Sequence, residues 1–119
     1  MNSPAESKNS TTGERHVRTL CDREILFDEE DFFWDFDDWF EEAADVLAKE
    51  AGLAALDDRH WQAINFLRNF YRENGRAPLN RQLKKGTGSS LLELEALFPG
   101  GLKYGARRLA GLPNPKNCA

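Results

Sequence analysis

Residues 57–75, which read DDRHWQAINFLRNFYRENG, decide the fold class. Large apolar side chains recur there every three or four residues, which is the period of an amphipathic helix; they are Trp61, Ile64, Leu67, Phe70 and Tyr71. An aspartate at 57 or 58 suits the start of a helix, and Asn74-Gly75 suits its end. We therefore expect a helix from Asp57 or Asp58 to Asn74, with one apolar face that needs partners.

Four shorter helices are expected to cover that face. Each is defined by an apolar stripe between a capping residue or proline and a glycine. They run from 37 or 38 to 51, with a capping box at Asp38 and Glu41 and a stop at Gly52; over 79–85, after Pro78 and before Gly86; over 91–98, capped by Ser90 and Glu93; and over 102–110, before Gly111. No repeat of fixed period is present, so these helices predict one compact helical domain.

The segment before the helices favours a β-hairpin. Apolar residues alternate loosely over residues 17–33, and a turn at Asp22-Arg23 would join two short strands. Two strands alone are only marginally stable, so we expect them to pack on the helices. Residues 1–16 contain few apolar groups and are expected to form a disordered tail. The predicted domain thus spans residues 17–110, and residues 111–119 form a C-terminal arm.

Composition limits the functions that are possible. The chain has 119 residues and a formal net charge of −4, which suits one globular domain and argues against a dedicated nucleic-acid binder. Residues 22–50 hold thirteen acidic and two basic side chains, whereas residues 68–119 hold ten basic and three acidic ones. The basic half suits an acidic partner, an anion or a thiolate, although solvated helix faces would give the same pattern.

From this sequence we expect neither a membrane protein nor a secreted, disulfide-rich or metal-binding one. It contains no apolar run that could span a membrane and no signal-peptide core, so we expect a cytoplasmic protein. The two cysteines, Cys21 and Cys118, are too few for a disulfide framework. No pair of histidines or cysteines has the spacing of metal ligands, so we expect neither a metal nor another cofactor.

The arm carries the chemistry that we expect. Pro113 and Pro115 prevent a helix and favour an extended backbone, so the residues after Gly111 could reach about 25 Å. Cys118, near the end of this flexible arm, could take a sulfur atom from one protein and deliver it to another. The attacking species would be the thiolate. An incidental cysteine at a frayed terminus is the alternative that composition and spacing leave open.

Motifs spread over about residues 20–119 resemble, in order, those of the DsrC/TusE group of sulfur-relay proteins. The matching pieces are Asp38-Trp39; His60-Trp61 with Phe66-Leu67-Arg68 and Phe70-Tyr71; Pro78, Arg81, Leu83 and Lys85; Leu97-Phe98-Pro99 with Gly101; and 110–115 with Cys118. The resemblance implies a mainly α fold, a small orthogonal helical bundle with an N-terminal β-hairpin and a flexible C-terminal arm.

The resemblance also implies the role of the arm. Cys118 matches the cysteine that carries sulfur as a persulfide, whereas Arg107 stands where the dissimilatory branch has a second cysteine. A single cysteine can hold and pass on a persulfide but cannot release sulfur through an internal disulfide. The chain therefore resembles the TusE-like branch, a sulfurtransferase-type carrier rather than a free-standing enzyme, which relays sulfur toward 2-thiouridine in tRNA.

Partners and supporting residues follow from the same resemblance. The expected donor is similar to TusBCD or DsrEFH, and the acceptor is an MnmA-like tRNA thiolase or a sulfite-reductase-like protein, with tRNA as an indirect partner. Cations that could stabilise the thiolate or persulfide are Arg81, Lys85, Arg107, Arg108 and Lys116. Exposed helix charges are the alternative for Arg81 and Lys85. We expect a structural role for His60 and an incidental one for Cys21.

Two other functions remain open. The chain departs from the family pattern at Leu102, where proline is usual, and at Asn114, where lysine is usual. It could therefore be a divergent single-cysteine DsrC-like protein in dissimilatory sulfur oxidation or its regulation. Alternatively, the helices expected over 58–74 and 79–85 resemble a helix-turn-helix, and the basic C-terminal half could contact nucleic-acid phosphates.

Overall fold

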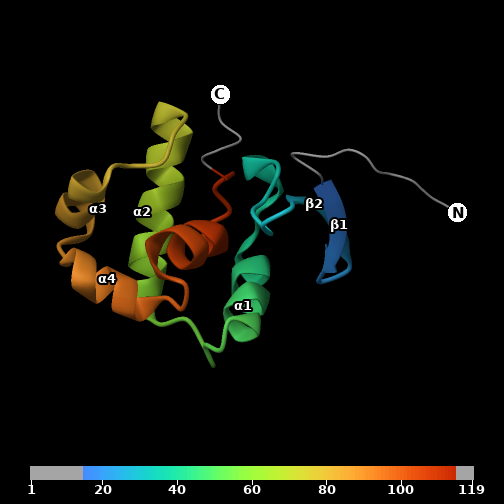
Figure 1. The fold of residues 1–119 in the computed structure, drawn as a ribbon, viewed down its shortest axis with the longest axis horizontal. Coiled ribbons are helices and arrows are strands. Elements are labelled where there is room, and N and C mark those ends of the chain that lie inside the picture. Colours follow the sequence, from blue (N-terminus) through green and yellow to red (C-terminus); the bar gives the residue numbers. More distant parts are fainter. Residues whose placement is uncertain (1–14, 115–119) are drawn as a thin grey trace, which may run out of the picture.

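The computed structural model describes residues 15–114 and shows a helical bundle with an N-terminal hairpin. From left to right, Figure 1 shows α3 and α4, then α2, then α1, and finally the hairpin. Side chains from all of these elements meet in one core; its larger members are Leu20, Ile25, Phe27, Leu47, Ile64, Leu67, Leu83, Leu94, Phe98, Leu109 and Leu112. None of the helices within residues 15–114 is long and apolar enough to cross a membrane.

The hairpin consists of antiparallel strands β1 (Arg15–Leu20) and β2 (Arg23–Asp28). Its turn is Cys21-Asp22, one residue earlier than predicted, and both residues have positive φ, 52° and 67°. Left-handed conformations at both central residues give a two-residue turn whose twist matches that of the strands. β1 begins at Arg15, inside the segment expected to be the disordered tail. Ile25 and Phe27 project from one face of β2 and are buried in the core.

The first long helix begins later than expected. A short 3₁₀ helix, η2 (Phe36–Asp38), is capped by Asp35, and the chain is then extended at Trp39 and Phe40. The helix α1 (Glu41–Glu50) starts only after that, so the predicted capping box of Asp38 and Glu41 does not form. In this extended stretch the indole of Trp39 makes a tertiary contact instead, with the carbonyl oxygen of Leu109.

The central helix α2 (Asp58–Asn74) follows the prediction at both ends. The Asp57 carboxylate accepts hydrogen bonds from the backbone N–H groups of Arg59 and His60, at 3.0 and 3.1 Å. Gly75 ends the helix with φ of 73°, in the left-handed region. Helix α2 buries one face, on which Ile64 and Leu67 are fully shielded from solvent.

The next two helices form within one or two residues of the predicted bounds, and the main difference concerns Gly86. Helix α3 (Asn80–Thr87) continues through Gly86, which was expected to stop it, and ends before Gly88. A Cβ atom at position 86 would lie 2.1 Å from the Phe66 ring, so this glycine allows α3 to pack closely on α2. Helix α4 (Leu91–Leu97) has the predicted capping box of Ser90 and Glu93.

The last helical segment, η3 (Leu102–Arg107), is wound as a π-helix and continues for a short turn to Leu109. The sequence predicts a helix there but not its wider winding. Gly105 lies against the preceding turn, because a Cβ atom on it would be 2.5 Å from the Pro99 carbonyl oxygen. This close packing holds η3 in the core, with Ala106 and Leu109 buried, and so fixes the place where the C-terminal segment begins.

Candidate functional site

The site expected from the sequence is only partly described by the structure. Cys118 and Lys116 lie outside residues 15–114. Of the arm predicted over residues 111–119, the structure describes the first four residues, 111–114, which we call the arm base. Leu112 and Asn114 in the arm base are almost fully buried, at 1% and 0% exposure. The arm base is therefore packed on the bundle.

Three side chains distant in sequence bond to the arm base or to the two residues that precede it. The Trp39 indole Nε1 donates a hydrogen bond of 2.7 Å to the Leu109 carbonyl oxygen, and Arg68 Nη1 donates one of 2.9 Å to the Ala110 carbonyl oxygen. At the other end, Asn114 Nδ2 donates to Glu30 Oε1 at 2.6 Å. The first two bonds satisfy carbonyl groups that the end of a helix leaves without intrahelical partners.

Arg68 is the buried cation beside the arm base that sequence reasoning missed. Its guanidinium lies between the rings of Phe36 and Trp39, 3.9 and 4.1 Å from their centroids, and it also points Nη1 and Nη2 at the Phe36 carbonyl oxygen, each 3.4 Å away. Burial, and secondarily repulsion from Arg72, lowers the pKa of Arg68 to about 10. The signal was available, since Arg68 is four residues after Ile64 and thus falls on the apolar face of its helix.

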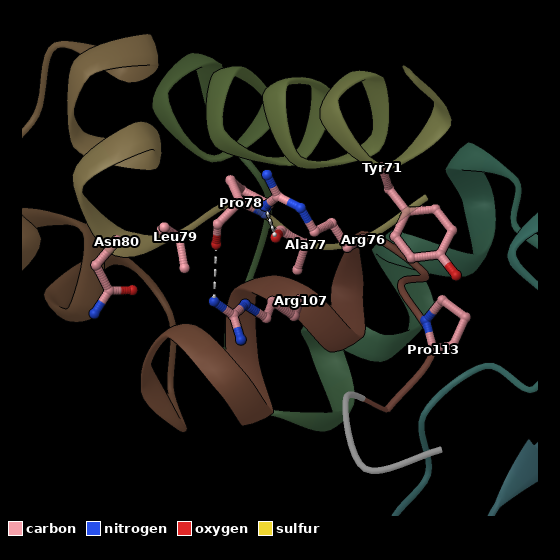
Figure 2. A pocket seen from close by; sticks show the side chains of 8 residues that line it. All are labelled: Tyr71, Arg76, Ala77, Pro78, Leu79, Asn80, Arg107 and Pro113. Atoms are coloured by element: carbon pink, nitrogen blue, oxygen red, sulfur yellow. Dashed lines mark hydrogen bonds between the residues drawn. The ribbon is translucent and has the colours of Figure 1, made fainter. Parts of the chain in front are cut away.

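A cavity of about 430 Å³ lies beside the arm base. We call it the arginine cavity, because Arg76 and Arg107 line it together with Tyr71, Pro78, Leu79 and Pro113. Figure 2 shows Arg107 approaching the backbone at Pro78, and Pro113 beside the Tyr71 ring. Arg107 is therefore next to the segment that leads to Cys118.

The hydrogen-bond donors of Arg107 are only partly paired within residues 15–114. Its Nη2 donates to the Pro78 carbonyl oxygen at 3.3 Å, while its buried Nε has no hydrogen-bond partner among the described residues. Burial lowers the pKa of Arg107. A partly desolvated cation with no carboxylate partner in the described chain can accept an anion at little additional desolvation cost.

The other predicted cations lie elsewhere. Arg108 Nε donates to the Asp31 carbonyl oxygen at 3.1 Å, so this side chain ties η3 to the loop after β2. Arg81 and Lys85 line a second hollow of about 630 Å³ between α3 and α4, together with Lys84. The structure thus does not gather the predicted cations into one site, although Asn80 lines both hollows.

His60 and Cys21 lie away from the arginine cavity. His60 is buried at the start of α2, where the Asp57 backbone N–H donates to its Nδ1 at 3.1 Å and its Nε2 donates to the Leu97 carbonyl oxygen at 2.8 Å. These contacts give it the structural role that was predicted. Cys21 is an exposed free cysteine in the hairpin turn. Within residues 15–114, histidine, cysteine and acidic side chains form no group of three or more that could hold a metal ion.

Comparisons with known proteins agree with this arrangement. The family model described as DsrC like protein matches residues 19–119. The gamma subunit of the dissimilatory-type sulfite reductase of Nitratidesulfovibrio vulgaris is 41% identical over 91 residues, which are 76% of this chain and 87% of that protein. The sulfurtransferase TusE of Pectobacterium atrosepticum is 37% identical over 103 residues, which cover 81% of this chain and 94% of that protein. The solution structure of Allochromatium vinosum DsrC superimposes with a TM-score of 0.74 at 36% identity, covering 89% of this chain and all of that one.

Proposed function

Since this chain belongs to the DsrC-like protein family, we propose that it is a sulfur carrier that accepts sulfane sulfur as a persulfide on Cys118 and relays it between proteins. The observation that carries the proposal is the extent of the family match, which runs through residue 119 and so includes Cys118. The anchored arm base supports it, because a carrier thiol needs a fixed point of departure from a rigid body.

The proposed chemistry is thiol–persulfide exchange. The Cys118 thiolate attacks the outer sulfur of a donor persulfide, a new S–S bond forms, and the donor leaves as a thiolate. In the second step an acceptor thiolate removes the same sulfur from Cys118. Arg107 occupies the position at which the resemblance places a second cysteine, so release through an internal disulfide at that position is not available.

The predicted supporting cations differ in how well they fit this proposal. Arg107 fits best, because it shares the arginine cavity with Pro113. Lys116, two residues from Cys118 in the sequence, remains a proposal based on its position alone. Arg108 already donates to backbone carbonyl groups, whereas Arg81 and Lys85 line the second hollow. We assign these last three no direct contact with the thiol.

The two kinds of relative suggest different acceptors. The name of the TusE relatives favours a relay from a TusBCD- or DsrEFH-like donor to an MnmA-like tRNA thiolase, with tRNA as an indirect partner. The gamma-subunit relative favours the alternative, a sulfite-reductase-like acceptor in dissimilatory sulfur metabolism. Offering the loaded protein to both acceptors and measuring which one removes the sulfur faster distinguishes the two proposals.

A nucleic-acid-binding function is the second candidate. Helices α2 and α3 are joined by a short connection, and Arg81, Lys84 and Lys85 are exposed on α3. Such a module would bind duplex DNA with strong salt dependence, and Cys118→Ser would not alter the affinity. Binding of that kind, combined with an unreactive Cys118, would favour this candidate over sulfur relay.

The sulfur-carrier proposal is tested by loading the protein and chasing the sulfur. The full chain is incubated with a persulfide-loaded donor protein, and the intact mass is measured before and after an acceptor thiol is added. We expect a gain of one sulfur atom that the chase removes. The matched variants are Cys118→Ser, which should not load, and Cys21→Ser, which should load as the wild type does. Equal loading of both variants would overturn the proposal.

A further inference from the structure

The arginine cavity contains a cation that the described protein does not neutralise. The Arg107 guanidinium is half-buried, its Nε is shielded from solvent without a hydrogen-bond partner, and only its Nη2 bonds to the backbone, at Pro78. A buried donor left unpaired costs about 1–3 kcal/mol. Because Nε is closed to solvent, a ligand in the cavity would meet the Nη side of the guanidinium, and this half-buried cation favours a ligand that brings both a negative charge and hydrogen-bond acceptors.

The rest of the cavity indicates what kind of anion it suits. Arg76 contributes a second guanidinium, which is exposed, lies 5.2 Å from the centroid of the Phe70 ring and, among residues 15–114, donates to the neighbouring Ala77 carbonyl oxygen at 3.3 Å. Pro78, Leu79 and Pro113 supply apolar walls. Guanidinium groups bind carboxylates in a two-pronged geometry, and a volume of about 430 Å³ is in the range of small-molecule sites. The cavity therefore suits a small organic carboxylate better than a bare inorganic ion.

The position of the cavity connects it to the carrier thiol. Pro113 lines it, and Cys118 follows Pro113 by five residues, a stretch that spans at most about 18 Å. A ligand held by Arg107 and Arg76 is thus within the tether length of the thiol. A cavity on the opposite side of the bundle would have no such relation to Cys118.

We propose that the arginine cavity binds a small organic persulfide through its carboxylate, and that Cys118 takes the outer sulfur directly from this ligand. The identity of the ligand rests on the proposed sulfur-carrier function, whereas binding of a small carboxylate does not. In the reaction the Cys118 thiolate attacks the outer sulfur of R–S–SH, one S–S bond forms as the other breaks, and the donor leaves as R–S⁻. Atoms and charge balance, and no oxidant or reductant is consumed.

Binding is tested first, with a ligand that cannot react. S-methylglutathione carries carboxylates but no sulfane sulfur, and its affinity for the full chain is measured by NMR titration or calorimetry. We expect Arg107→Gln and Arg76→Gln each to weaken binding about tenfold or more, as loss of a charge-assisted hydrogen bond does. Arg23→Gln, which removes an exposed arginine of the hairpin, is the control and should bind as the wild type does. Equal affinity in all four proteins, or no binding, would overturn the inference.

Sulfur transfer is tested second, with glutathione persulfide at limiting concentration. We expect Cys118 to load more slowly in Arg76→Gln and Arg107→Gln than in the wild type, while a persulfide-loaded donor protein loads all three at equal rates. If only loading from the protein donor depends on the two arginines, the cavity receives an acidic side chain of a partner and the small-molecule inference is wrong. If neither donor loads Cys118, the sulfur-carrier function itself fails.

Discussion

Arg68 and Arg107 are both withdrawn from water beside the arm base, but the protein accommodates them differently. Arg68 is stacked between two aromatic rings and donates to two backbone carbonyl groups, at Ala110 and Phe36. Among residues 15–114, Arg107 has one bond to the backbone, and its buried Nε has no hydrogen-bond partner. We infer that Arg68 stabilises the fold at the start of the arm, whereas Arg107 remains available for a ligand.

Substituting Arg68 should therefore lower stability. Arg68→Met removes the stacked cation and leaves the Ala110 carbonyl oxygen without its donor, so we expect the free energy of unfolding to fall by about 3 kcal/mol. The control is Arg72→Met, one turn further along α2, where the exposed side chain bonds to Asn69 and the change should stay within about 0.5 kcal/mol. Denaturant unfolding measures both, and equal effects would contradict the assigned role.

At the scale of elements, local sequence signals predict a helix end well where a capping side chain or a glycine decides it without tertiary contacts. Asp57 and Gly75 bound α2 as expected, because side-chain caps and left-handed glycines are local features. Gly86 was expected to end a helix, but α3 continues through it. Its small size allows close contact with the Phe66 ring instead. The late start of α1 accompanies the contact of Trp39 with Leu109, seventy residues away, which no local pattern reveals.

Two of the glycines that end helices, Gly75 and Gly111, provide a prediction about the arm base. Gly111 and Gly75 have nearly the same φ, 77° and 73°, but a Cβ atom at 111 would lie 2.5 Å from the Trp39 ring, whereas one at 75 meets nothing within 4 Å. Gly75→Ala should cost about 1 kcal/mol for backbone strain, and Gly111→Ala at least about 2 kcal/mol more because Trp39 must move. Unfolding midpoints in denaturant measure the difference, and equal costs would show that Trp39 does not press on the arm base.

The cap of α2 makes stability depend on pH. Backbone hydrogen bonds from His60 and Arg59 hold the pKa of Asp57 below its ordinary value of 3.8. Because the folded-state pKa is the lower one, this stabilisation is complete above the ordinary pKa and is lost as the pH falls through the folded-state value. Asp57→Asn should thus be less stable than the wild type at pH 7, and the difference should shrink below about pH 4. A difference that stays constant down to pH 2 in thermal unfolding would contradict this account.

At the scale of the whole molecule, the sequence predicts more of the fold than of the site. The hairpin, the helices and the basic C-terminal half follow from periodicity, caps and charge. The sequence does not predict that the expected cations lie in different places, because helix packing decides this. Arg108 contacts Asp31, Arg107 lines the arginine cavity, and Arg81 and Lys85 line another hollow. The position of Arg68 on the apolar face of α2 is visible in the sequence, but its stacking on the Phe36 and Trp39 rings depends on tertiary packing.

The position of the hairpin turn leads to a prediction about oxidation. Figure 1 places the turn between β1 and β2, which contains Cys21, at the lower end of the hairpin, whereas the described chain ends at the upper side of the molecule. Cys118 is four residues beyond that end, a reach of about 14 Å. Mild oxidation should therefore link two chains through Cys118 rather than join Cys21 to Cys118. Peptide mapping under non-reducing conditions tests this, and a dominant internal bridge would contradict it.

The measurement that tests the account most directly is the location of the transferred sulfur. The wild-type protein is treated with a limiting amount of persulfide donor, digested without reduction, and analysed by tandem mass spectrometry. The account predicts the additional sulfur atom on the peptide that contains Cys118, with Cys21 unmodified. Sulfur found on Cys21 in preference to Cys118, or on neither cysteine, would contradict the claim that this chain is a sulfur carrier acting through its C-terminal arm.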